Sequence, residues 1–384
     1  MTAALSPPRS GRPPTAGLPI IRRWTFPLLL LQAQTAAVLC DEPPAVTAPS
    51  AKITRQQPAT EPESGSVLPP NVAPRPLILA FSSLRDRPAF AAVYFYRHDG
   101  VSQGELLPGP PQQPERSDTH SSLTADGTIC LSTSKQVGGF GPRVQLYDRQ
   151  RSTFLPEPPF NDTFAARTEA TISANGRWIV LSAWDQAGQP GGWDLLLYDR
   201  HANRFVDLPG LNTAANEREP AISPDGRWIT FVTDRPTGAG LSDVGLYDRE
   251  AASLVELPGL NTPHRELNPV PSPDGQHLAF ISNRPGGAGG KDLYLYDRST
   301  RQVRAPAGLN SAGHEQTPRF SPDGRYLVFV SERSTGPGER DLFLYDLLQN
   351  QLLPTPGLNS PAEDFDPAIA QPMVASALPH SPSR

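Results

Sequence analysis

The chain repeats itself about every 49 residues, and this period constrains the fold more than any other feature. The clearest copy begins at Pro220 with Pro-Ala-Ile-Ser-Pro-Asp-Gly-Arg-Trp-Ile-Thr-Phe, continues through a glycine-rich stretch, and ends in Gly-Leu-Tyr-Asp-Arg at Arg249. Similar copies occupy residues 269–298 and 318–346, and weaker ones occupy residues 170–200 and 121–149. Similarity at a fixed period predicts a repeat architecture in which each copy folds as one supersecondary unit.

Each repeat is predicted to contain four short strands. Ala-Ile-Ser forms the first, and Ser-Pro-Asp-Gly forms a turn in which proline fixes φ and glycine takes the left-handed position. The second strand alternates apolar and polar residues, as in residues 228–233, and the third is typified by residues 292–297. A short fourth strand ends at Pro-Gly-Leu-Asn, residues 258–261. This pattern predicts a propeller blade, whereas a solenoid needs shorter repeats and a helical repeat needs a 3.6-residue period.

The two ends of the repeat region complement each other. Residues 77–85 match a second strand and residues 93–96 match a third, but no Ser-Pro-Asp-Gly precedes them. The missing first strand recurs at the other end, where residues 366–370 repeat the pattern of residues 219–223. We therefore predict an all-β fold: a six-bladed β-propeller of four-stranded blades, closed by a C-terminal strand that completes the N-terminal blade.

Composition divides the rest of the chain. Residues 1–40 are predicted to be an export signal or leader, residues 41–72 a Pro-rich flexible linker, residues 73–371 the propeller, and residues 372–384 a disordered tail. The formal net charge of −5 gives little reason to expect nucleic acid as a partner. The propeller forms one cooperative unit because its ends meet, and we expect a monomer.

The leader has a basic start, an apolar middle and small residues before Cys40, which is the pattern of an export signal. We therefore expect a periplasmic or envelope-associated protein. Lipid attachment at Cys40 is the less favoured alternative, because Ala37 and Leu39 stand where a lipobox usually has leucine and a small residue. The other cysteine, Cys130, lies in a predicted strand and is expected to be a buried apolar residue.

Charges recur at two positions of the repeat, nine residues before and nine residues after the turn glycine. If the two strands form a hairpin, these positions face each other, and we predict a structural ion pair, exposed to solvent, in each blade. The predicted pairs are Glu217–Arg235, Glu266–Arg284, Glu315–Arg333, Asp364–Arg85 and, with the signs inverted, Arg167–Asp185. In one blade the pattern is imperfect, with Asp118 facing Gln136 beside Lys135. The alternative is an acidic ring at the channel mouth that holds a cation or a basic peptide.

Motifs for catalysis are missing from the sequence. It contains no Gly-x-Ser-x-Gly, no phosphate loop and no His-Glu-x-x-His. Three histidines in predicted loops, His120, His264 and His314, are interpreted as solvated residues rather than metal ligands. We therefore predict no catalytic residue, no metal and no cofactor.

The predicted binding residues lie around the glycine-rich loops, which vary most between repeats. Trp184 and Trp193 flank one such loop, and exposed aromatic side chains commonly anchor partners. An aspartate recurs before each third strand and either lines the channel entrance or caps a turn: Asp194, Asp243, Asp292 and Asp341.

The pattern Ser-Pro-Asp-Gly-Arg followed by Asp-Leu-Tyr-Leu-Tyr-Asp resembles the WD40-like (PD40) repeat of the TolB family. Residues 223–235, 272–284 and 321–333 carry it best, and the resemblance covers about 300 residues. It implies a six-bladed propeller in the periplasm and, among partners, peptidoglycan-associated lipoprotein. The chain departs from TolB before the propeller, where TolB has a folded α/β domain and residues 41–72 have the composition of a linker.

Two functions from different classes follow. The first is a non-enzymatic TolB-like propeller in the cell envelope, which binds a protein or peptide through loops at the channel face. The alternative is a propeller that binds a carbohydrate or small molecule, or acts on it with a metal. A metal-dependent rise in melting temperature would favour the alternative.

Overall fold

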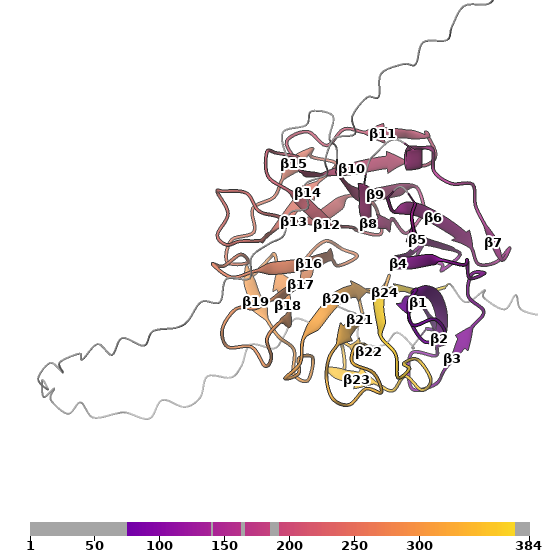
Figure 1. Ribbon diagram of the computed structural model, residues 1–384. Coiled ribbons are helices and arrows are strands. Elements are labelled where there is room, and N and C mark those ends of the chain that lie inside the picture. The colour runs from indigo at the N-terminus through magenta and orange to yellow at the C-terminus, as the bar shows by residue number, and fades with distance from the viewer. Residues whose placement is uncertain (1–74, 140, 163–165, 185–191, 373–384) are drawn as a thin grey trace, which may run out of the picture. The chain divides into compact units, whose positions relative to one another are not determined.

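In the computed structural model, residues 75–139, 141–162, 166–184 and 192–372 are described. Within these residues, the strands form six four-stranded antiparallel sheets, each one a propeller blade. Figure 1 looks down the ring, with the innermost strand of each blade (β24, β4, β8, β12, β16 and β20) around the centre. The predicted fold class, six blades of four strands, is confirmed.

Each blade takes its strands in chain order from the centre outward, except the first. Blade 1 contains β24 (Asp364–Ala370), β1 (Leu77–Ser83), β2 (Ala92–His98) and β3 (Gly104–Leu107). Blade 2 contains β4 (Arg116–Leu123), β5 (Ile129–Gln136), β6 (Arg143–Asp148) and β7 (Thr153–Phe154). Blade 3 contains β8 (Ala166–Ile172), β9 (Trp178–Trp184), β10 (Trp193–Asp199) and β11 (Arg204–Val206). A short 3-10 helix, η1 (Pro159–Asp162), precedes blade 3.

The remaining three blades repeat this arrangement most regularly. Blade 4 contains β12 (Glu217–Ile222), β13 (Trp228–Thr233), β14 (Asp243–Asp248) and β15 (Ser253–Leu254). Blade 5 contains β16 (Glu266–Pro271), β17 (His277–Ser282), β18 (Asp292–Asp297) and β19 (Gln302–Arg304). Blade 6 contains β20 (Glu315–Phe320), β21 (Tyr326–Ser331), β22 (Asp341–Asp346) and β23 (Gln351–Leu353). Among the described residues, no helix is long and apolar enough to cross a membrane.

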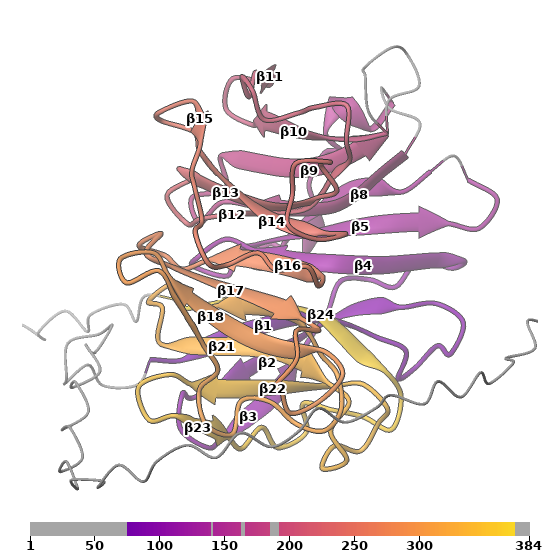
Figure 2. The ribbon, with the colours of Figure 1, turned by 90° about the vertical axis from the view of Figure 1, so that its left-hand side faces the viewer.

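The ring closes through a pairing between the two ends of the repeat region. β24 runs antiparallel to β1, with Ile78 opposite Ala370 and Ala80 opposite Ala368. Figure 2 shows this strand, in yellow, beside β1. The pairing completes blade 1, so β1 has a neighbour on both sides and does not present an open sheet edge.

The antiparallel order gives the ring two different faces. The turns between first and second strands, such as Ser223–Gly226, and those between third and fourth strands lie on one face, which we call the turn face. The glycine-rich loops between second and third strands, such as residues 234–242, and the connections between blades lie on the other, which we call the loop face.

The hydrophobic core lies between neighbouring blades. One cluster, for example, joins Trp178 and Val180 of blade 3 to Ile229 and Phe231 of blade 4. Tyr247 extends across the same junction and donates a hydrogen bond to the carbonyl of Pro209 at 3.1 Å. Tyr296 and Tyr345 donate in the same way to Pro258 and Ala307, which are the equivalent carbonyls of the preceding blades.

Every innermost strand contains a bulge, and the residue inside the bulge has a positive φ between 44° and 54°. We call these six residues the bulge ring: Asp366, His120, Glu169, Glu219, Asn268 and Thr317. The extra residue shifts the pairing of everything on the loop-face side of it.

Candidate functional site

The repeated carboxylates of the loop face are buried, not exposed as predicted. Glu266 has no solvent exposure, and its Oε1 accepts hydrogen bonds from Arg284 Nη2 at 3.1 Å and from Ser282 Oγ at 3.0 Å. Thr262 donates to the same carboxylate through its hydroxyl at 2.6 Å and its backbone N–H at 3.2 Å. Arg284 also donates to the carbonyl of Leu260, in the connection from the preceding blade, at 2.8 Å. The carboxylate is therefore not available at the channel mouth.

Three other blades contain the same ion pair. Arg235 Nε lies 3.1 Å from Glu217, Arg333 Nη2 lies 3.5 Å from Glu315, and Arg85 Nη2 lies 2.8 Å from Asp364. All three carboxylates have no solvent exposure. Burial raises the pKa of Glu315, and its hydrogen bonds from Ser311 and Ser331 act against this increase.

The observed register of these pairs differs from the predicted one by two residues, and the bulge accounts for one of them. Glu217 lies opposite Thr233, not Arg235, and Arg235 reaches back to it from two residues further along. In blade 2, Asp118 lies opposite Ser134 and not Gln136, which lies opposite Arg116, while Lys135 lies opposite Ser117. Asp185 and the side chain of Arg167 lie outside the described part of the structure, so the inverted pair stays a prediction.

The aspartates before the third strands hold the glycine-rich loops. Asp292 Oδ1 accepts backbone hydrogen bonds from Ala288 at 3.0 Å and Gly289 at 3.1 Å, and Gly240 and Gly338 donate likewise to Asp243 and Asp341. These aspartates and Asp194 are all buried. Burial raises the pKa of both Asp243 and Asp341. Of the two alternatives for these residues, the geometry matches turn caps and not a lining of the channel entrance.

The predicted tryptophans do lie together on the loop face. Trp184 and Trp193 are opposite each other in β9 and β10, and their rings meet edge to face with centroids 5.8 Å apart. Trp184 is 37% exposed although it is a large apolar residue. Exposed aromatic surface of this kind is typical of binding anchors.

Two further residues of the loop face were missed by the sequence analysis. Val137, which follows β5, is 62% exposed, and Leu241, which precedes β14, is 69% exposed. With Trp184 they put one exposed apolar side chain on each of three consecutive blades, 2, 3 and 4. We call these three residues the apolar loop residues. A single valine or leucine in a polar loop carries little signal by itself, because only the ring shows that the three loops are neighbours.

The loop histidines do not gather into a site. His120 belongs to the innermost strand β4 and not to a loop, which corrects its predicted position. His264 precedes β16, and His314 pairs with Lys291 beside blade 5. In the described ranges, no three or more histidine, cysteine, aspartate or glutamate residues are arranged to hold a metal ion.

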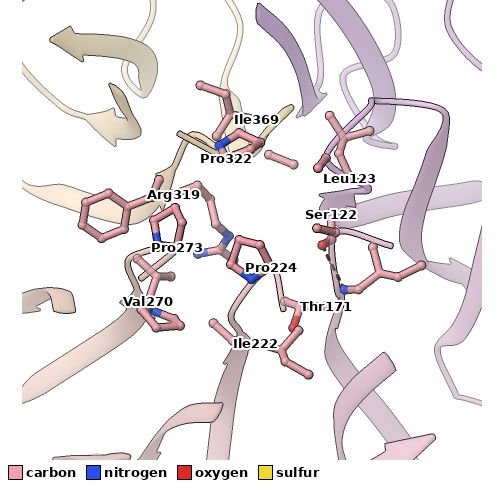
Figure 3. A pocket seen from close by; sticks show the side chains of 17 residues that line it. Ser122, Leu123, Thr171, Ile222, Pro224, Val270, Pro273, Arg319, Pro322 and Ile369 are labelled. Atoms are coloured by element: carbon pink, nitrogen blue, oxygen red, sulfur yellow. Dashed lines mark hydrogen bonds between the residues drawn. The ribbon is translucent and has the colours of Figure 1, made fainter. Parts of the chain in front are cut away.

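The central channel contains two small cavities on either side of Arg319. The one near the turn face has a volume of about 90 Å³ and is lined by aliphatic side chains and by Pro224, Pro273 and Pro322. Figure 3 shows the Arg319 side chain pointing into it. The other cavity, of about 50 Å³, is lined by the bulge ring and by Arg319.

Solved structures with the same fold are numerous. TolB from Acinetobacter baumannii matches 76% of this chain and 66% of its own length, with a TM-score of 0.53 and 17% identity. A protein described as TolB from Agrobacterium tumefaciens matches 77% of this chain and 98% of its own length, with a TM-score of 0.48 and 16% identity. Hydrazine synthase from Kuenenia stuttgartiensis matches 78% of this chain and 47% of its own length, with a TM-score of 0.53 and 10% identity.

These similarities concern the fold alone, since identities this low do not carry a function. The likeness to TolB agrees with the resemblance in the repeats, and the likeness to hydrazine synthase shows that an enzyme also uses this fold. No protein-family model matches the chain, and a search of curated proteins finds no match.

Proposed function

We propose that the protein is a non-enzymatic, TolB-like propeller of the cell envelope that binds a protein or peptide through its loop face. The observation that supports this most directly is the row of apolar loop residues, Val137, Trp184 and Leu241, on three adjacent blades. Rigid blades hold these loops in fixed relative positions, which lowers the entropy lost when a partner binds. The predicted leader at residues 1–40 supports export.

The same observations change which residues make the contact. The buried aspartates and ion pairs of the loop face have partners inside the protein, so we assign binding to the apolar loop residues and to Trp193. Partners that bury an aromatic or aliphatic side chain beside Trp184 fit this surface best. By resemblance in the repeats, peptidoglycan-associated lipoprotein is the first purified partner to test.

The experiment is affinity capture from an envelope extract with the full chain as bait and mass spectrometry as the measurement. The loop-face variant is W184A/L241A. The matched control is V101A/L348A, which removes two exposed apolar side chains from third-to-fourth-strand turns on the turn face. We expect a protein that is enriched by the wild type and the control and lost with the loop-face variant.

A purified partner then gives the quantitative test. Loss of a tryptophan anchor and a leucine contact is expected to weaken binding by at least about tenfold. Equal loss with the turn-face control would place the contact elsewhere. If a folded bait captures nothing and does not bind peptidoglycan-associated lipoprotein, the alternative of a carbohydrate or small-molecule ligand becomes the better hypothesis.

A further inference from the structure

One level of the channel is lined by small side chains in five blades and by an arginine in the sixth. The first paired residue on the turn-face side of each bulge points into the same cavity. At this level the five small side chains and the arginine are Ser122, Thr171, Ala221, Val270, Ala368 and Arg319. Figure 3 shows the arginine reaching from its strand toward the other lining residues. A single long side chain among small ones thus fills the middle of the channel.

The next level, toward the loop face, is the bulge ring, and three of its six side chains are carboxylates. Their backbones are linked around part of the ring, because among the described residues, at four of the six blade junctions, the side chain of one bulge residue accepts a hydrogen bond from the backbone N–H of the next. Glu219 donates to Glu169 at 2.8 Å, Asn268 donates to Glu219 at 2.7 Å, and His120 donates to Asp366 at 3.0 Å. These bonds hold the carboxylates of Glu169, Glu219 and Asp366 around the cavity that Arg319 also lines.

This concentration of negative charge perturbs the groups around it. Burial and the neighbouring charge of Glu169 raise the pKa of Glu219. Burial lowers the pKa of Arg319, and the carboxylates of Asp366, Glu169 and Glu219 act against that decrease. Its Nη1 donates to the carbonyl of Pro318 at 2.8 Å, and in the part of the chain that is described no carboxylate forms a direct ion pair with it. The guanidinium therefore balances the ring as a whole and is not the partner of one member.

We propose that Arg319 is the resident counter-ion of the bulge ring and the plug of the central channel. Its charge offsets the three carboxylates, and its length closes the passage between the cavity under the turn-face prolines and the loop face. A partner that docks on the loop face is then confined to that face and does not thread through the ring. The three carboxylates are half-buried, and carboxylates that are partly withdrawn from water without a compensating charge are unfavourable, so the ring needs the charge of the plug.

A double-mutant cycle tests the proposal, with the melting temperature of the full chain as the measurement. R319M removes the charge and keeps an unbranched apolar side chain, which is shorter than that of arginine. E219Q removes one negative charge and keeps an oxygen that accepts the hydrogen bonds from Asn268. We expect R319M to lower the melting temperature by about 6 °C at pH 7.5, and R319M/E219Q to regain at least half of that loss.

The matched control is R319M/E256Q, because Glu256 is exposed and lies outside the channel. It is expected to regain nothing. If R319M does not fold, folding of R319M/E219Q but not of R319M/E256Q supports the counter-ion. Purely additive effects of R319M and E219Q, or an R319M protein as stable as the wild type, would overturn the proposal.

The pH dependence gives an independent test. The titratable and charged groups that face or influence this cavity are His120, Glu169, Glu219, Asp366, Arg319, Arg218 and Lys291. Because the pKa of Glu219 is raised, lowering the pH from 7.5 towards 5 favours its protonated form, which removes one negative charge from the ring and partly compensates for the missing cation. The stability deficit of R319M is expected to shrink over this interval. A deficit that stays constant or grows would contradict the counter-ion.

Discussion

The buried carboxylate of Glu266 is satisfied by donors from three separate parts of its surroundings: the connection before blade 5, the second strand, and the loop after it. Arg284 is itself fixed, since its guanidinium lies 5.0 Å from the ring centroids of both Phe280 and Tyr294. In the folded protein the carboxylate of this ion pair has no contact with water and is stabilised only by its protein partners. Removing one partner then leaves a buried charge without compensation.

The substitution E266A is therefore expected to lower the free energy of unfolding by about 3 kcal/mol, whereas a solvent-exposed pair would contribute less than about 1 kcal/mol. Chemical denaturation of E266A, R284A and the double variant measures the coupling between the two residues. E256A, at an exposed glutamate, is the control and should cost little. A cost for E266A no larger than for this control would contradict the structural role of the buried pair.

Cys130 provides a second test at the level of one side chain. It lies in β5 with 2% exposure, and burial raises the pKa of its thiol to about 12. The C40S substitution leaves Cys130 as the one thiol in the sequence. Because the thiolate is the reactive form, the folded C40S protein should not react with a thiol reagent at pH 8. In denaturant, one thiol per C40S chain should react. Rapid labelling of the native protein would show that the strand opens locally.

At the level of strands and turns, sequence reasoning predicted the hairpins correctly and missed the bulges. The Ser-Pro-Asp-Gly turn and the alternation of Trp228 to Thr233 are local signals, and both predicted the hairpin. The extra residue at Glu219 leaves no such signal, because it simply follows two other charged residues, Glu217 and Arg218. The charges were paired correctly by sign but placed two residues out of register, one of which is due to the bulge, and they were assumed to be exposed.

The turn glycine packs against the neighbouring blade. Gly226 has a φ of 79°, and a Cβ built on it would lie 2.4 Å from Cδ1 of Trp178. The guanidinium groups of Arg177 and Arg249 lie over the ring of Trp178, at 4.4 Å and 4.5 Å from its centroid. The glycine thus allows the turn of blade 4 to rest directly on the tryptophan of blade 3.

We expect G226A to lower the free energy of unfolding by about 3 kcal/mol, through both a left-handed backbone and a steric clash. Gly210 separates these two causes, since its φ is 72° and open space surrounds it. G210A should cost only about 1 kcal/mol. Equal costs for the two variants, measured by denaturant unfolding, would mean that contact with Trp178 contributes nothing.

The whole ring was predictable from the sequence because the repeat period, the strand pattern and the two complementary ends all describe the same closed object. The binding surface was predictable only in part. The repeated polar residues stood out in the sequence, but they have structural roles: Asp292, for example, accepts a backbone hydrogen bond from its own glycine-rich loop. Val137 and Leu241 do not repeat, and their proximity depends on the order of the blades around the ring.

Closure of the ring gives the prediction for the whole molecule. A chain that ends at residue 363 lacks β24 and leaves β1 with an unpaired edge and an exposed apolar surface. We expect this chain to aggregate or to lose its cooperative melting transition. A chain that ends at residue 372 keeps β24 and is the control. If the shorter chain melts cooperatively at the wild-type temperature, β24 is dispensable for closure.

The split blade also has a consequence for biosynthesis. β1 is among the first strands to leave the ribosome, but its inner neighbour β24 follows about 280 residues later. At about 5–20 residues per second, the first strand waits roughly 15–55 s for its partner. If the chain is exported unfolded, the whole ring folds only after translocation ends. The incomplete blade 1 is then never exposed to other nascent chains during synthesis.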